Sequence, residues 1–262
     1  MACFSTFYEF IMDKKTRVRL DRLLVERGIA LTRERARALI MAGSVLVEET
    51  MMDNAGVLVI PDVAIRLKGE DNPYVSRGGL KLKGVLEKFG INVRDLVALD
   101  VGASTGGFTD CLLQEGAAKV YAIDVGYGQL AWKLREDKRV VLIERTNIRY
   151  FAGAGISDRI DIAVIDVSFI SLKLVIPPVL KLIGEEASVL ALIKPQFEVR
   201  REDVGKRGVV SDPALHGKVV EEIADFCRGI HLDVFGACES SPAGPSGNKE
   251  FFIYARKRTN DR

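Results

Sequence analysis

The chain has 262 residues, of which 48% are hydrophobic and 28% are charged, so we expect a globular protein with a buried core. The formal net charge is only +2, which by itself argues neither for nor against a nucleic-acid partner. The four cysteines show no C-x-x-C spacing and only two histidines accompany them. This pattern argues against a zinc site and against a disulfide framework, and we expect no metal.

No targeting or membrane segment is evident. No apolar run approaches the roughly 18 residues that a membrane span needs. The first residues lack the basic region of a signal peptide, and the sequence after Met12 reads like a natural beginning, so translation could start there. We therefore expect a cytoplasmic protein with no membrane partner.

Residues 17–72 follow the pattern of two short helices and a small sheet. Asp21 and Thr32 are the expected N-cap residues of the helices, and Gly28 and Gly43 are expected to end them. β-rich apolar segments follow at residues 44–49, 57–60 and 64–69. The pattern predicts an independent α+β domain.

The beginning of this domain is strongly basic. Between residues 14 and 37, nine lysines and arginines stand against three acids, a local balance of +6. Such a segment is typical of a phosphate-binding face, although a solvated helix surface fits the charge equally well. The candidate RNA contacts are Arg17, Arg19, Arg22, Arg33, Arg35 and Arg37.

A segment with a proline and a glycine pair, over residues 73–80, leads to a region with another rhythm. Here β-rich apolar segments alternate with helical segments, which predicts a mainly parallel sheet buried on both faces. The last two strands follow each other closely, which suggests that the final strand is antiparallel. The predicted strands are 96–101, 119–124, 140–144, 160–166, 188–194, 231–238 and 250–256, and the predicted helices are 108–115, 128–136, 172–183 and 213–229.

The run DVGASTGGF at residues 100–108 is the expected ligand loop of this sheet. It has neither the G-x-G-x-x-G spacing of a dinucleotide site nor the Lys-Ser/Thr ending of a P-loop. Asp100 would repel a pyrophosphate, but it suits S-adenosylmethionine, which has a sulfonium and an amino group and no phosphate. Asp124 ends the next strand, where an acid can accept hydrogen bonds from ribose hydroxyls. A tight turn without a ligand is the alternative.

Two further polar residues end apolar strands at the same edge of the predicted sheet, namely Asp166 and Lys194. A lysine at the end of a buried strand needs a reason, because desolvation disfavours its charge. Catalysis is one reason, and an ion pair between Lys194 and Asp166 that holds two loops is the other. Lys81 and Glu250 could join these residues.

Several runs together resemble the TlyA family, often labelled hemolysin A, from about residue 17 to residue 256. The family joins an RNA-binding domain of the ribosomal-protein S-four type to an FtsJ/RrmJ-like methyltransferase, and it 2′-O-methylates cytidine in ribosomal RNA with S-adenosylmethionine. The resemblance implies an RNA-binding domain at 17–72, a linker at 73–80, and a Rossmann-like domain with a seven-stranded, mostly parallel sheet at 81–258. The runs that carry it are YVSRGGLKL, DVGASTGGFTD, DVGYGQLAWKLR, ERTN, DVSFISL, LIKPQFEV, GVVSDP and GPSGNKEFF.

The resemblance also implies roles for individual residues. The proton of the ribose hydroxyl would be taken by Lys194, or Lys194 would orient the hydroxyl and stabilise the developing oxyanion. Asp166 would also hold the amino group of the methionine moiety. One departure is Glu48-Glu49-Thr50, where such RNA-binding domains usually turn through Asn-Gly or Asp-Gly; the two acids would weaken a phosphate contact there. The family's catalytic tetrad falls on Lys81, Asp166, Lys194 and Glu250, and its cofactor contacts fall on Asp100, Gly102, Ser104, Gly106, Gly107, Phe108, Asp124, Asn147 and Asp166.

Three other functions remain open at the level of sequence. The first is RNA binding without catalysis. The presence of the expected residue types at all four tetrad positions argues against it. The second is membrane lysis, as the hemolysin label suggests. The lack of a long amphipathic helix with a wide apolar face in the sequence argues against it. The third is a nicotinamide-dependent oxidoreductase, against which the G-x-G-x-x-G pattern is missing.

Overall fold

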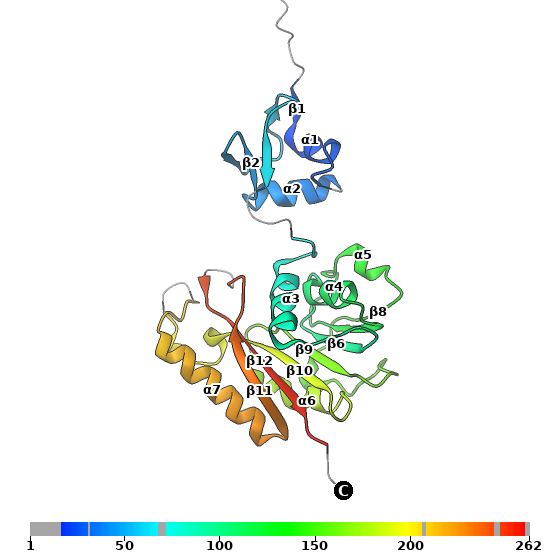
Figure 1. The fold of residues 1–262 in the computed structure, drawn as a ribbon, viewed down its shortest axis with the longest axis vertical. Helices are drawn as coiled ribbons and strands as arrows, with labels where there is room; N and C mark the ends of the chain where they lie inside the picture. The colour runs from blue at the N-terminus through cyan, green and yellow to red at the C-terminus, as the bar shows by residue number, and fades with distance from the viewer. Residues whose placement is uncertain (1–16, 31, 68–71, 206–207, 244–246, 260–262) are drawn as a thin grey trace, which may run out of the picture. The chain divides into compact units, whose positions relative to one another are not determined.

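The computed structural model (Figure 1) describes residues 17–30, 32–67, 72–205, 208–243 and 247–259. The chain forms two compact units, and the second begins at Asn72. Met12 and the two lysines at positions 14 and 15 lie outside the described residues. Within the predicted linker, the residues from Arg77 onward form the first turn of helix α3 (Arg77–Phe89). The predicted domain limits of 17–72 and 81–258 stay a proposal.

The first unit is a small α+β fold. Its apolar core includes Leu20, Leu24 and Ile40, which the helices bury against the strands. Its helices are α1 (Leu20–Glu26) and α2 (Arg33–Met41). Strand β1 (Val18–Arg19) pairs antiparallel with β4 (Leu58–Val59), and β2 (Val45–Val47) pairs antiparallel with both β3 (Thr50–Met52) and β5 (Ile65–Leu67).

Most of the predicted helix signals in this unit are confirmed. The side chain of Thr32 accepts a hydrogen bond from the backbone of Arg35 at 3.2 Å and caps α2. Gly28 and Gly43 follow the two helices with φ angles of 69° and 65°. The prediction that Asp21 is a cap is wrong: α1 already begins at Leu20, and the side chain of its N-cap residue, Arg19, does not cap the helix. Guanidinium groups occupy the Asp21 carboxylate instead.

The β2–β3 hairpin turns at Glu48-Glu49, where the resemblance implied a turn. Glu48 and Glu49 occupy its two central positions with φ angles of 48° and 64°. Such angles favour Asn-Gly, so two glutamates there are strained. The carboxylate of Glu49 pairs with Arg66 at 2.5 Å, which neutralises part of the acidic charge at the turn.

The second unit contains the predicted seven-stranded sheet. Its strands are β6 (Val97–Val101), β7 (Lys119–Ile123), β8 (Val140–Ile143), β9 (Ile162–Ile165), β10 (Ser188–Ile193), β11 (Leu232–Glu239) and β12 (Phe251–Lys257). Their order is β11-β12-β10-β9-β6-β7-β8. Strands β6 to β10 run parallel to one another, and β12 is antiparallel to both β10 and β11, as its position in the sequence suggested.

Helices cover both faces of this sheet (Figure 1). Helices α3 and α4 (Gly107–Gln114) contribute Leu82 and Leu112 to the core on one face. Helices α6 (Leu172–Leu180) and α7 (Pro213–Gly229) contribute Val175 and Ile223 to the core on the other. Helix α5 (Trp132–Arg135) is shorter than the predicted range 128–136. Further helical turns among the described residues include η1 (Ile148–Tyr150), η2 (Pro195–Phe197) and η3 (Arg201–Asp203).

The order of the strands creates a crevice between β6 and β9. From β6 the chain continues to β7 on one side, whereas β9 lies on the other side. Loops that leave adjacent strands in opposite directions open a gap beyond their carboxyl ends, where α/β proteins bind ligands. The glycine-rich loop follows β6 and Asp166 follows β9, so both predicted site segments reach this crevice.

Candidate active site

The glycine-rich loop at residues 102–106 lies directly against the end of β9. Gly102 has a φ angle of 86°, and a Cβ atom there would overlap the backbone oxygen of Asp166. Gly106 has a φ angle of 97°, and a Cβ atom there would overlap Leu134. Only glycine satisfies both the backbone angle and the close approach at these positions.

Asp100 lies on β6, two residues before Gly102, and is completely buried. Its Oδ2 accepts a hydrogen bond from the hydroxyl of Thr109 at 2.6 Å, whereas its buried Oδ1 has no partner among the described residues. Burial, with a smaller contribution from the nearby charge of Asp166, raises the pKa of Asp100 to about 7 against the opposing effect of the Thr109 bond. Its Oδ1 is thus a buried acceptor without a partner among the described residues, which calls for an explanation.

Asp124 follows β7 and fixes the shape of the glycine-rich loop. Its Oδ2 accepts a hydrogen bond from the backbone of Ser104 at 2.7 Å, and its Oδ1 accepts one from the backbone of Gly126 at 2.6 Å. An ionised carboxylate has about four acceptor positions, so two bonds leave it capacity for ribose hydroxyls. Sequence reasoning found the residue but not its role in holding the loop.

Asp124 lines a cavity of about 570 Å³ beside the loop, a size typical of small-molecule sites. Asn147 lines the same cavity, and its side-chain oxygen caps η1 by accepting from the backbone of Arg149 at 3.1 Å. Asp166 and Phe169 border it from the end of β9. The predicted cofactor contacts Asp124 and Asn147 thus share one cavity.

The four tetrad residues form two ion pairs. The ammonium of Lys81, on α3, lies 2.5 Å from the carboxylate of Glu250, and both side chains are almost fully buried. The ammonium of Lys194, at the end of β10, lies 2.6 Å from Asp166, and these side chains are 12% and 24% exposed. Lys194 also donates a hydrogen bond to the hydroxyl of Ser168 at 3.0 Å. Each lysine is therefore paired with one carboxylate.

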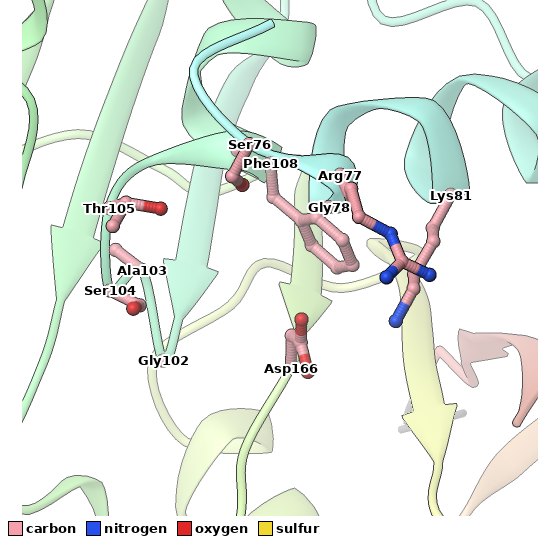
Figure 2. A pocket seen from close by; sticks show the side chains of 11 residues that line it. Ser76, Arg77, Gly78, Lys81, Gly102, Ala103, Ser104, Thr105, Phe108 and Asp166 are labelled. Carbon is pink, nitrogen blue, oxygen red and sulfur yellow. The ribbon is translucent and has the colours of Figure 1, made fainter. Parts of the chain in front are cut away.

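A second cavity, of about 380 Å³, connects the two pairs to the glycine-rich loop. Lys81 and Asp166, one member of each pair, both line it. Figure 2 shows Lys81 and Arg77 reaching from α3 and Asp166 from the end of β9, with the glycine-rich loop on the other side. Gly102, Ser104 and Asp166 border both cavities, which makes the two cavities neighbours.

Several residues at this site were not singled out from the sequence. Phe169 is 91% exposed and has a φ angle of 64°, which is rare for a bulky residue; its ring lies 5.0 Å from that of Phe197. Glu198 accepts hydrogen bonds from Ser171 and from the backbone of Leu172 at 2.6 and 2.7 Å. It thereby ties the loop after β9 to the segment after β10. Phe169 and Glu198 stand close in the sequence to Asp166 and Lys194, and this proximity is the sequence signal that could have identified them.

The candidate RNA-binding arginines all lie in the first unit, with different surroundings. Arg22 pairs with Glu26 at 2.7 Å on the surface of α1. Arg17 is exposed and Arg35 is partly exposed. The others, Arg19, Arg33 and Arg37, converge on one carboxylate.

The described residues contain neither a membrane-spanning helix nor a metal-binding cluster. No helix in the ranges given above is long and apolar enough to cross a membrane. No cluster of three or more histidine, cysteine or acidic side chains among those residues could hold a metal ion.

Comparison with known families agrees with the two-unit architecture. The model of the FtsJ-like methyltransferases matches residues 74–257, and the model of the S4 domain matches residues 18–60. The protein is thus an FtsJ-like methyltransferase with an N-terminal S4 domain, and methyltransferases of this class use S-adenosylmethionine. The unpartnered Asp100 carboxylate and the glycine-only approach at Gly102 fit that cationic, phosphate-free cofactor.

Within this class the chain belongs to the TlyA family, also called hemolysin A. It is 44% identical over 244 residues to TlyA of Mycobacterium tuberculosis, named a 16S/23S rRNA (cytidine-2'-O)-methyltransferase, with 93% of this chain and 91% of that protein covered. YqxC of Bacillus subtilis is 48% identical over 90% of this chain and 84% of its own length. A solved structure from Streptococcus thermophilus that carries a hemolysin name is 42% identical, with a TM-score of 0.73 over 93% of this chain and 90% of that one.

Proposed function

We propose that this protein transfers the methyl group of S-adenosylmethionine to the ribose 2′-hydroxyl of a cytidine in ribosomal RNA. One observation carries the proposal: two lysine–carboxylate ion pairs lie beside the glycine-rich loop. Lys81 pairs with Glu250, and Lys194 pairs with Asp166. The printed function of the TlyA relative supports the choice of nucleotide and RNA. Because ribosomal subunits are the substrate, we infer that the protein works in the cytoplasm.

The cofactor would be held by the glycine-rich loop and by acids on either side of it. Asp124 would accept hydrogen bonds from the ribose hydroxyls, Asn147 would contact the adenine, and Asp100 and Asp166 would face the amino group of the methionine moiety. Once bound, S-adenosylmethionine supplies an electrophilic methyl group on a sulfonium. The remaining contacts would come from Gly102, Ser104, Gly106, Gly107 and Phe108, which form or border the loop.

The chain's own residues must place the hydroxyl and manage its proton. A ribose hydroxyl is a weak nucleophile at neutral pH, so positioning and proton removal both lower the barrier. Lys194 is our candidate for this role. As a base, it must first be neutral and then accept the proton as the oxygen–carbon bond forms; as an ammonium, it orients the oxygen and stabilises its developing charge. Asp166 holds the nitrogen of Lys194 in place at 2.6 Å.

Phe169 is our candidate for contact with the target base. It is the most exposed of the large hydrophobic side chains described, it borders the larger cavity, and it directly follows Ser168, whose hydroxyl accepts from Lys194. Its positive φ angle is unfavourable for a bulky residue, and such strain is concentrated at functional sites. A base pulled from its stack into an active site is commonly held against an aromatic ring.

The RNA itself would be bound largely by charge on the first unit, through the six arginines named above. Because phosphate contacts release counterions, RNA affinity should fall steeply with rising salt. Phosphate contacts of this kind set position and orientation and leave the choice of nucleotide to the second unit.

A map of ribosomal RNA methylation in cells tests the function. A 2′-O-methyl group protects the following phosphodiester bond from alkali, so modified sites appear as gaps in a cleavage ladder. Cells without the gene should lose at least one protected cytidine, the gene should restore it, and the Lys194→Ala gene should not. An unchanged map in cells without the gene contradicts the proposal.

A further inference from the structure

One buried carboxylate in the first unit binds three arginines. Asp21 is completely buried in the first turn of α1. Its Oδ1 accepts a hydrogen bond from Nε of Arg19, and its Oδ2 accepts from Nη2 of Arg19, both at 3.0 Å. The same Oδ2 accepts from Arg33 at 3.1 Å and from Arg37 at 3.2 Å.

The arginines come from two separate elements. Arg19 ends β1, whereas Arg33 and Arg37 stand four residues apart on α2 and therefore share one face of that helix. Nothing in the backbone alone requires their guanidinium groups to meet, and three like charges at close range repel one another. The carboxylate offsets that repulsion, and the hydrogen bond from Arg19 in particular holds the pKa of Asp21 well below its usual range.

The cluster keeps positive charge and free donors at the surface. The three arginine side chains are 45%, 49% and 51% exposed, while the carboxylate is inaccessible. Three cations against one anion leave a net charge of +2. Each guanidinium has five N–H donors, and Asp21 takes only one or two from each, which leaves donors on these half-exposed side chains for a ligand.

We propose that Asp21 is a positioning residue that holds Arg19, Arg33 and Arg37 together as one binding site for an RNA phosphodiester group. The inference rests on the proposed function, because it takes ribosomal RNA as the ligand. Forked guanidinium donors suit phosphate oxygens better than a point charge does. A site built in advance also avoids the entropic cost of gathering three long side chains when RNA binds.

This organised site and simple charge counting predict opposite effects for one substitution. Asp21→Asn removes a negative charge from a basic face, so charge counting predicts tighter RNA binding. If Asp21 organises the arginines, the same change releases them and weakens binding. Glu26→Gln is the matched control, because Glu26 pairs with a single exposed arginine, Arg22, on the same helix as Asp21.

The experiment measures binding of full-length variants to ribosomal subunits purified from cells that lack the protein, over a range of salt concentrations. We expect Asp21→Asn to weaken binding about ten-fold or more and to lower the slope of log affinity against log salt, since fewer phosphates are contacted. Glu26→Gln should bind as tightly as wild type or more tightly. S-adenosylmethionine affinity, which belongs to the second unit, should not change in either variant. Equal or tighter binding by a folded Asp21→Asn protein overturns the inference.

If a thermal melt shows that the first unit of the Asp21→Asn variant does not fold, a second pair of variants tests the inference instead. Arg37→Gln and Arg22→Gln each remove one positive charge, but only Arg37 belongs to the cluster. The organised site predicts a several-fold larger loss of affinity for Arg37→Gln, and equal losses overturn it. If the wild-type protein itself does not bind the subunits, the proposed function fails, which is a different result.

Discussion

The buried carboxylate of Asp100 offers a prediction whose size can be worked out from the structure. Burial raises its pKa from 3.8 to about 7 on folding. Below pH 4 it is protonated in both the folded and the unfolded state and has no effect on stability. Between pH 4 and pH 7 only the folded state keeps the proton, so the free energy of unfolding falls as the pH rises. At about 1.4 kcal/mol for each pKa unit, ionised Asp100 destabilises the fold by about 4 kcal/mol.

Asp100→Asn removes this dependence because the amide does not titrate. The amide can keep the bond from Thr109 through its oxygen, but its nitrogen takes the place of the unpartnered Oδ1, which costs about 1–3 kcal/mol at every pH. The two effects are separable because only one of them varies with pH. Relative to the variant, the wild-type protein should lose about 2–3 kcal/mol of stability between pH 5 and pH 8.

Chemical denaturation of both proteins at a series of pH values measures the difference. Titration with S-adenosylmethionine extends the test: a cation beside Asp100 favours its ionised form, so the ratio of wild-type to variant affinity should increase from pH 6 to pH 8. Taking the ratio removes the titration of the cofactor itself. Stability curves that run parallel would refute the reasoning about Asp100, and a constant affinity ratio would refute its contact with the cofactor.

The other predictions concern the glycine-rich loop and the lysine at the end of β10. Lys194→Ala should keep its melting temperature within a few degrees and still bind S-adenosylmethionine, while single-turnover methyl transfer falls about 10²-fold or more; early melting together with lost cofactor binding would indicate a structural ion pair instead. Lys194→Arg separates the two roles, because a guanidinium stays charged: a retained rate points to charge alone, and a lost rate fits a base. Asp124→Ala should weaken cofactor binding by about 1–3 kcal/mol in calorimetric titration, the scale of a charge-assisted hydrogen bond, and unchanged isotherms would exclude the contact. Gly102→Ala should reduce cofactor affinity and rate together, because its Cβ would displace Asp166; wild-type kinetics would show that the two loops need not touch.

The sheet could be predicted because its strands are long, apolar and separated by helical segments. Strands β1 and β3 could not, because they are short and largely exposed and carry no alternating pattern. The pair Gly78-Gly79 was interpreted as part of a connection, yet both residues lie inside α3. The physical reason is close packing: a Cβ atom on Gly79 would overlap the ring of Tyr74. This glycine therefore allows close contact within the fold and does not form a turn.

The site was predictable where topology brings residues together. Asp166 and Lys194 end neighbouring parallel strands, so their meeting follows from the order of the sheet. The pairing of Lys81 with Glu250 joins residues 169 positions apart, and the local sequence around each gives no sign of the other; the resemblance to a family supplied it. Asp21 was misinterpreted for the same reason, because its arginine partners on α2 lie beyond the reach of a local capping rule.

The central claim is tested most directly with purified components. Wild-type protein, methyl-deuterated S-adenosylmethionine and ribosomal subunits from cells lacking the gene are incubated together, and the RNA is digested to nucleosides for mass spectrometry. The account predicts deuterated 2′-O-methylcytidine as the labelled product, and its loss with Lys194→Ala. Label in a methylated base, label in another nucleoside, or RNA binding without any transfer would contradict it.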